Sequence, residues 1–512
     1  MASFTFQPAL RPALPCVYGP LDYREQRALF ERIDGILAVS GLEQEFVNLK
    51  LSGSKINTDA MSSKRFDRFA RLSVLALRSN IARSLTGLSH RDFCARLADS
   101  PLLQWFLQVG QVDSVKTFSK SSSERFGQWV SEENLRVINQ KFTALLSLTV
   151  EDQAEAQTPS ALFGLPKSIV FDDIYFDSTC LKSDIHFPVD WVLLRDAART
   201  LMKATVIIRK HGLKNRMPQE PLEFLSEMNT LCMKMAAKGR AASGKKQRKK
   251  VLREMKSLEK RIADHANAHL TALKTRRHET ELSEAQAQQI ISRMEGVLGQ
   301  LPAAIKQAHE RIIGGRRIAN EEKILSLYDD TVNVIVRGKA GANVEFGNKL
   351  WLGENRDGII VDYKLYQDNP SDSTLASPAL VRLIDDQNIG VQQVWGDRGL
   401  TSKVNSAMLE RRKIGDGFCP RNVTELSNRL ASEEGFRAGL KRRAATEARI
   451  GIFKNVFLGG KMLAKGFKRR ELAVGWAALT HNLWVVARMA ETEKKRKANQ
   501  EFTTRLPKAR AA

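Results

Sequence analysis

The sequence predicts an α+β protein of several domains, in which long helical segments accompany a smaller core that contains strands. Apolar residues recur at helical spacing through 1–165 and again through 191–324. Short apolar runs that end in acidic or glycine-rich turns occur at 168–180 and 389–400, as expected for strands. At 512 residues the chain is too long for one ordinary hydrophobic core. Roughly two to four domains are therefore expected.

The composition is strongly basic, with a formal net charge of +24 and a pI near 9.9. Such an excess of Lys and Arg favours a polyanionic partner, because neutralised phosphates release their counterions. The five cysteines are scattered without a Cys-x-x-Cys pair, which argues against a zinc site and for a reducing compartment. No apolar run of about 18 residues and no apolar signal core occur, so we expect no membrane partner and a cytoplasmic location.

Residues 1–165 are predicted to form a helical DNA-binding domain. A Pro-rich start at 1–20 is expected to be extended, and 150–165 are polar enough to be a linker. A Ser-rich turn before the SSERF segment is similar to a helix-turn-helix, in which Arg125 at the start of a helix would face phosphate. The alternative, which the sequence leaves open, is that these serines only cap a helix of a bundle.

Residues 191–324 are predicted to be a helical, basic insertion. Two antiparallel helices are expected, with a weak turn signal at 278–280 between them. A run at 238–253 contains no acidic residue, so it favours DNA contact over an ordinary solvated helix face. Its candidate DNA-binding residues are Lys245, Lys246, Arg248, Lys249 and Lys250. The long periodic helices are also compatible with dimerisation.

Residues 166–190 and 325–490 are predicted to form the core that contains strands. Two apolar runs flank a turn at 355–358, as in a β-hairpin. Further along, we expect the following elements: a helix at 377–386, a strand that ends at Asp397, a helix at 401–413, a strand near 417–419 and an apolar helix at 471–489. The tail at 491–512 is basic and is expected to be disordered.

A charged stripe is predicted on the helix that covers 441–457. At about 100° per residue, Glu447 and Lys454 lie roughly 40° and 20° around the helix from Arg443. One carboxylate between two cations suits a site that holds a divalent metal and grips a phosphodiester. The alternative is an i,i+4 Arg–Glu pair on a solvated face.

Two aspartates at predicted strand ends add to this stripe. Asp177 ends the apolar run IYFD, and Asp397 lies in a Gly-Asp-Arg-Gly turn after a short strand. Asp172 and Asp173 compete with Asp177, but they lie inside the apolar run rather than at its end. Asp177, Asp397 and Glu447 are therefore the candidate catalytic and metal-binding carboxylates.

These segments, FDST, GDRG and the helix with Arg443, Glu447 and Lys454, resemble the DDE transposases of bacterial insertion sequences. The third-carboxylate helix of that family carries the pattern Tyr-x2-Arg-x3-Glu-x6-Lys. The spacing matches here, with Leu440 at the tyrosine position. The resemblance implies an RNase H-like mixed-sheet catalytic core, in which the predicted hairpin supplies the second and third strands. It covers about 166–190 and 325–490 and does not extend to the remaining segments.

The resemblance implies an enzyme that binds the double-stranded ends of its own mobile element, cleaves them and joins them to target DNA. Two magnesium ions, for which manganese can substitute, would be held about 4 Å apart by hard oxygen ligands. Arg443 and Lys454 would contact the DNA backbone, and a homodimer would act in a synaptic complex. Two alternatives remain: a catalytically inactive DNA-binding protein derived from a transposase, and an RNase H-like nuclease that cuts without joining.

Overall fold

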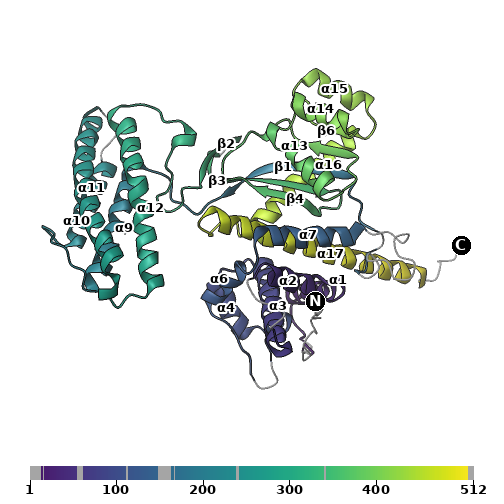
Figure 1. The fold of residues 1–512 in the computed structure, drawn as a ribbon. Helices are drawn as coiled ribbons and strands as arrows, with labels where there is room; N and C mark the ends of the chain where they lie inside the picture. The colour runs from purple at the N-terminus through teal and green to yellow at the C-terminus, as the bar shows by residue number, and fades with distance from the viewer. Residues whose placement is uncertain are drawn as a thin grey trace. The chain divides into compact units, whose positions relative to one another are not determined.

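The computed structural model of the chain describes residues 13–14, 17–54, 61–110, 114–147, 163–165, 168–237, 242–339 and 342–505. As predicted, the protein is α+β, with a mixed sheet of six strands among many helices (Figure 1). The chain forms two compact units. The sheet unit comprises Met1–Leu181, Lys349–Tyr366 and Pro370–Ala512, and the bundle unit comprises Lys182–Asn348 and Gln367–Asn369.

The sheet unit begins with helices that share one hydrophobic core with the strands. They are α1 (Leu21–Ser40), α2 (Leu42–Ser52), α3 (Ser63–Thr86), α4 (His90–Asp99), α5 (Pro101–Phe106), α6 (Lys120–Gly127) and α7 (Glu132–Ser147). The Phe46 ring of α2 lies 5.7 Å from the ring of Trp476, near the other end of the chain. The described helices between 21 and 147, which were predicted to belong to a domain of their own, are therefore packed into the same core as the sheet.

The Ser-rich segment does not form the short turn that a helix-turn-helix requires. Helix α6 starts after Ser119, whose side chain accepts the N–H of Ser122. The stretch from Leu107 to Ser119 separates α6 from α5, whereas a helix-turn-helix turn has about three or four residues. The geometry thus agrees with the capping interpretation.

The sheet of this unit follows the order β4-β3-β1-β5-β6. Its strands are β1 (Asp173–Lys182), β3 (Ala342–Asn355), β4 (Ile360–Leu365), β5 (Gln393–Gly396) and β6 (Gly415–Phe418). β1 pairs with β5 and β5 pairs with β6 in parallel, and β3 pairs with β4 in antiparallel orientation. β1 continues past Asp177 to Lys182, so Asp177 lies within the strand and not at its end as predicted.

The predicted hairpin is confirmed as β3 and β4. The side chain of Asn355 closes the turn, because its Oδ1 accepts the N–H groups of Asp357 at 3.1 Å and Ile359 at 2.9 Å. Gly358 has a φ of +91°, a conformation that glycine adopts without steric cost. Asn355 and Gly358 thus account for the turn at 355–358.

The helices predicted after the hairpin are present near the expected positions. They are α13 (Ala376–Val381), α14 (Lys403–Arg411), α15 (Val423–Ser432), α16 (Phe436–Ile452) and α17 (Phe467–Arg505). Helix α13 continues as a π-helix at Arg382–Asp386, and α16 continues as the π-helix η7 at Phe453–Phe457. The tail expected to be disordered is helical as far as Arg505, and 506–512 lie outside the described residues.

Helix α16 packs on the sheet face that carries Tyr175 and Trp395, which stack on each other with centroids 6.1 Å apart. A Cβ at Gly439 would lie 2.0 Å from the Trp395 ring, so only glycine permits this close approach. On the opposite face, Phe176 stacks on Trp351 at 4.9 Å. The alternation of side chains along β1 therefore separates two packed faces.

The free edge of the sheet at β4 is covered by helices. Asn482 of α17 accepts the N–H of Ile360 at 2.8 Å and donates to the Ile360 carbonyl at 2.8 Å. Asn139 of α7 donates to the same carbonyl at 3.3 Å. These amides satisfy backbone groups that an edge strand leaves unpaired. The apolar helix predicted at 471–489 is confirmed within α17.

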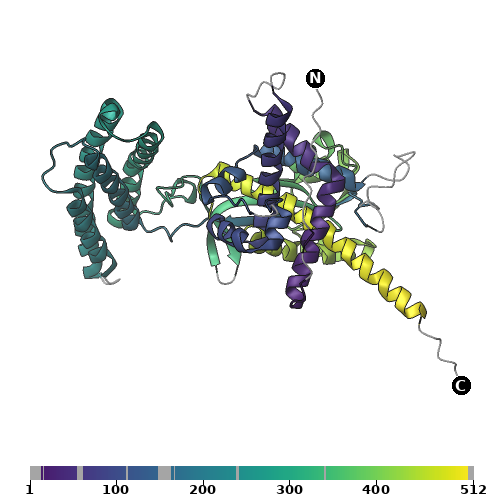
Figure 2. The ribbon, with the colours of Figure 1, turned by 90° about the horizontal axis from the view of Figure 1, so that it is seen from below.

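The bundle unit contains the predicted helical insertion. Its long helices are α9 (Asp190–Lys210), α10 (Pro221–Ala237), α11 (Ala242–Arg276) and α12 (Glu284–Ala308), which lie side by side in both views (Figures 1 and 2). The expected turn between α11 and α12 is present as a 3-10 helix at Arg277–Glu279. A capping box between Ser283 and Gln286 starts α12. The unit also includes β2 (Asn333–Lys339), which pairs with the start of β3, so it extends beyond the predicted limits of 191–324.

The predicted linker at 150–165 lies outside the described residues except for 163–165. The same holds for the predicted arm at 1–20, of which only 13–14 and 17–20 are described. Within the described part of the chain, no helix has the length and apolar character needed to cross a bilayer.

Candidate carboxylate site

Asp177 and Asp397 are brought together by the parallel pairing of β1 with β5. The register sets Tyr175 opposite Trp395, so the next residue on the same face of β1, Asp177, is level with Asp397 just past the end of β5. Asp397 thus follows its strand directly, as predicted. Its Oδ1 accepts the N–H of Gly399 at 2.9 Å, which holds the Gly-Asp-Arg-Gly turn in place.

Three of the other predicted residues, Asp397, Arg443 and Glu447, lie near enough to Asp177 to shift its pKa. Burial, and after it the nearby Asp397 carboxylate, are the main causes that raise the pKa of Asp177 to about 7. The N–H of Ser178 and the Arg443 guanidinium favour the charged form, whereas Glu447 again raises this pKa. Asp177, Asp397 and Glu447 therefore form one group of mutually repelling carboxylates.

Glu447 and Arg443 lie on α16 one helical turn apart. Arg443 Nη1 donates to Glu447 Oε1 at 3.4 Å, a long hydrogen bond. The Glu447 side chain is 59% exposed, whereas that of Arg443 is 21% exposed. Both predictions for the charged stripe are therefore compatible with the structure. Arg443 and Glu447 form an i,i+4 pair, and the charges of both also act on Asp177.

Lys454 reaches the same face of β1 by a different route from the one predicted. It belongs to the π-helix η7, so the angle computed for a continuous α-helix does not apply to it. Its Nζ donates to Thr179 Oγ1 at 3.1 Å, and Thr179 is the next residue after Asp177 on that face of β1. Lys454 is therefore beside the carboxylates despite the change of helix type.

Leu440, the departure from the family pattern, packs on the apolar cluster formed by Tyr175, Trp395 and Phe436. An apolar side chain at this position accordingly has a packing role in this chain. A tyrosine there would have to fit its hydroxyl among these rings.

A fourth carboxylate that the sequence analysis did not select lies next to the group. Asp372 Oδ1 accepts the hydroxyl of Ser178 at 2.8 Å and the ammonium of Lys349 at 2.9 Å. A Cβ at Gly399 would lie 3.0 Å from Asp397 Oδ1 and 3.4 Å from Asp372 Oδ2, so the two carboxylates are neighbours. The only sequence signal for Asp372 is its position in a polar turn, which does not distinguish it from other exposed aspartates.

Asp177 and Asp397 fit a site for a divalent cation. Their carboxylate oxygens are hard ligands, and the pKa of Asp177 is raised first by burial and then by the neighbouring Asp397 carboxylate, a repulsion that a bound cation would relieve. Among the described residues, no three His, Cys, Asp or Glu side chains converge closely enough to form a complete metal site by themselves. Glu447 would therefore have to move closer to the two aspartates to complete the ligand set.

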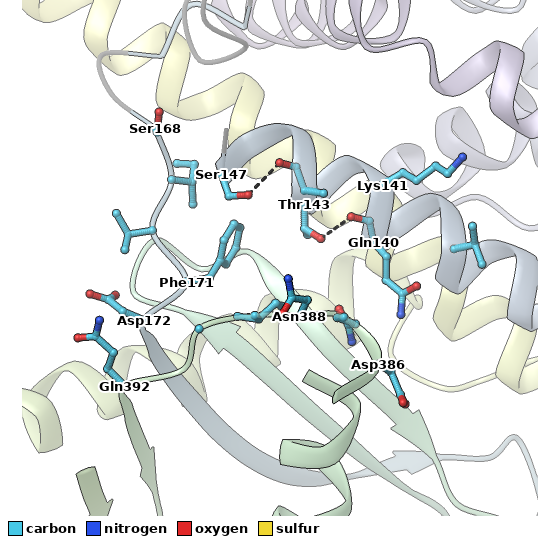
Figure 3. Close-up of a pocket in the computed structure, with 17 residues that line it drawn as sticks. Gln140, Lys141, Thr143, Ser147, Ser168, Phe171, Asp172, Asp386, Asn388 and Gln392 are labelled. Atoms are coloured by element: carbon cyan, nitrogen blue, oxygen red, sulfur yellow. Dashed lines mark hydrogen bonds between the residues drawn. The ribbon is translucent and has the colours of Figure 1, made fainter. Parts of the chain in front are cut away.

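The two aspartates that competed with Asp177 have other surroundings. Asp173 forms an ion pair with Arg356 in the turn between β3 and β4. Asp172 accepts the N–H of Asp173 and lines a cavity of about 710 Å³ between the end of α7 and the turn at 386–392 (Figure 3). Neither faces the carboxylate group, and Asp177 remains the candidate on β1.

The residues predicted to bind DNA outside this group are distributed over both units. In the bundle unit, Lys245, Lys246 and Lys250 are exposed near the start of α11, and Lys249 is partly exposed. The guanidinium of Arg248 instead lies over the Trp191 ring, 5.6 Å from its centroid, which indicates a packing role. In the sheet unit, Arg125 is exposed on α6 and donates to Ser122 Oγ at 3.1 Å.

Comparison with models of known families, with curated proteins and with solved structures gave no match.

Proposed function

We propose that the chain is a metal-dependent DDE transposase that cleaves the ends of an insertion sequence and joins them to target DNA. The observation that carries the proposal is the proximity of Asp177 and Asp397 on neighbouring parallel strands, with Glu447 of α16 near enough to raise the pKa of Asp177. Arg443 and Lys454 accompany them, as the family pattern requires of its cations.

The architecture of the sheet unit supports an RNase H-like core for this enzyme. The strand with Asp177 is central, the hairpin β3–β4 follows it in the chain on one side, and β5 with Asp397 pairs with it in parallel on the other. The helix with Glu447 packs on the face to which Asp177 belongs. The helical bundle is then an insertion between the first and second strands of this core.

The proposed roles follow from charge and position. Asp177, within β1, and Asp397, just past the end of β5, would hold divalent cations, and Glu447 would supply a third carboxylate. Bound magnesium would make the attacking oxygen more nucleophilic and stabilise the departing 3′ oxygen. Arg443 and Lys454 hold the DNA backbone so that the scissile phosphate stays beside the carboxylates.

Two further candidate functions differ in chemistry. An inactive DNA-binding descendant of a transposase would not need to keep acidic side chains near Asp177, so the nearness of Asp397 and Glu447 to it supports an active enzyme. An RNase H-like nuclease would use the same group but would not join strands. A strand-transfer product distinguishes the transposase from this nuclease.

The test uses the full chain with a duplex oligonucleotide that carries the inverted repeat flanking its gene. Asp177→Asn, Asp397→Asn and Glu447→Gln should each reduce magnesium-dependent nicking by several orders of magnitude. End affinity in a gel shift should change little, because the phosphate contacts remain. Asp172→Asn, which alters a carboxylate outside the group, is the matched control and should nick at the wild-type rate. Wild-type nicking by any of the first three variants would remove that residue from the site.

A second experiment addresses the DNA contact of the bundle unit. Replacing Lys245, Lys246, Lys249 and Lys250 by Gln should weaken binding and flatten the dependence of log K on log salt. Each lost phosphate contact lowers the slope by about one unit. Lys274→Gln is the control, since its ammonium pairs with Glu295 at 2.6 Å. An unchanged slope in the four-lysine variant would identify the run as a solvated helix face.

A further inference from the structure

One buried carboxylate, that of Glu354 near the end of β3, gathers three side chains of α16. Its Oε1 accepts the hydroxyl of Thr446 at 2.8 Å and the guanidinium groups of Arg442 and Arg449, each at 3.2 Å. Glu354 is 4% exposed, so these contacts form away from bulk water. The three partners are spaced i, i+4 and i+7, and they therefore lie on one face of the helix.

The backbone of the hairpin turn strengthens this attachment. Arg442 Nη2 also donates to the carbonyl oxygens of Asn355 at 3.0 Å and Arg356 at 2.7 Å. The Arg449 guanidinium packs on Gly358, where a Cβ would come within 2.6 Å of its Cζ. The turn between β3 and β4 thus holds α16 by a set of directional contacts centred on Glu354.

An apolar contact could attach α16 to the sheet at least as strongly, because a buried ion pair loses much of its Coulombic gain to desolvation. Directional hydrogen bonds instead fix the rotation of the helix about its axis. Thr446 precedes Glu447, and Arg442 precedes Arg443. A rotation that breaks the Glu354 contacts would turn Glu447 and Arg443 away from Asp177 by the same angle.

We infer that Glu354 is a positioning residue for the proposed reaction, fixing the rotation of α16 so that Glu447 and Arg443 face Asp177. This role rests on the proposed function. It also defines a structural element that acts on the reaction without touching DNA: the turn at 355–358 together with Glu354 and the face of α16 that it binds.

The test is Glu354→Gln in the full chain, which keeps the shape of the side chain and removes its charge. Nicking at saturating DNA should fall on the order of tenfold to hundredfold, because misplacement by about 1 Å has effects of this size. Half-saturation by magnesium should shift to higher concentration, whereas the dissociation constant for the end duplex should change less than about twofold. Hydrogen exchange should accelerate in peptides that cover 436–452 and not in those of the bundle unit.

Two further variants make the result decisive. Thr446→Val removes one of the three contacts and should change nicking and magnesium half-saturation in the same direction by a smaller amount. This variant still tests the inference if Glu354→Gln folds poorly. Glu433→Gln, which loses only a surface pair with Arg429, should behave as wild type. Faster exchange in α16 with unchanged nicking and magnesium half-saturation would make Glu354 purely structural and overturn the inference. A wild-type protein that nicks no end duplex would instead overturn the proposed function, and with it this role.

Discussion

Glu259 in the bundle unit gives a sharp prediction about stability and pH. It lies on α11 in the apolar core of the four helices and is fully buried; the backbone N–H of Ala198 favours its charged form, but burial outweighs this contact. Burial raises its pKa to about 8, well above the ordinary value of a glutamate. The folded protein therefore keeps this proton at neutral pH, where the unfolded chain has lost it.

The sign and size of the effect follow from this difference. Because the pKa is raised in the folded state, stability is highest below the ordinary pKa of 4.5 and falls as pH rises toward 8. At pH 7 the cost relative to acidic solution is about 3 kcal/mol, from the interval between pH 7 and that ordinary pKa. Glu259→Gln removes the titration, so the bundle of the variant should lack this loss.

The assay is hydrogen exchange of α11 peptides in the full chain, with variant and wild type compared at each pH between 5 and 8. The ratio of their opening constants should change by about 2.5 orders of magnitude across that range. The exposed Glu254 on the same helix provides the control, since Glu254→Gln should give a ratio independent of pH. If the profiles of Glu259→Gln and wild type run parallel, Glu259 is not a buried proton carrier.

Other changes in the sheet unit have expected sizes. Arg78→Leu should destabilise it by about 3–5 kcal/mol in denaturant unfolding, because the buried Arg78 bonds to the carboxylates of Asp34 and Glu43, which would lose their cation. A loss below about 1 kcal/mol would mean that these acids take up protons instead. Asn482→Ala should cost about 2 kcal/mol or more, since both backbone groups of Ile360 lose a partner, and a neutral result would require water to replace the amide.

The hydrophobic pattern was informative wherever local periodicity determines structure. The turn at 355–358 follows from its Asn and Gly residues, and the pairing of α11 with α12 follows from two apolar stripes. Asp397 was correctly predicted at a strand end because glycines bracket it. The same reasoning placed the end of β1 too early, at Asp177. When the residues of the opposite face are apolar, a charged residue in the middle of a strand resembles the end of the strand in the sequence.

Features that depend on distant segments were not predictable in this way. The π-helix at 453–457 has no distinct sequence pattern, so the angle predicted for Lys454 around a continuous α-helix was wrong. The prediction that Lys454 lies beside the carboxylates nevertheless agrees with the structure. Glu354 and Asp372 acquire their partners from residues far along the chain, and a single sequence shows no such contacts. The merging of the N-terminal helices with the sheet was missed because amphipathic stripes do not reveal what they pack against.

The amides that cover β4 have a consequence for assembly. Ile360 already has both backbone groups bound by Asn482, and the carbonyl of Tyr363 accepts a hydrogen bond from Arg136 of α7 at 2.6 Å. An incoming strand would have to displace these side chains before it could extend the sheet, which protects this margin against fibril-like growth. The other edge strands of the sheet are β2 and β6. Any strand that extends this sheet should accordingly pair with β2 or β6 and not with β4.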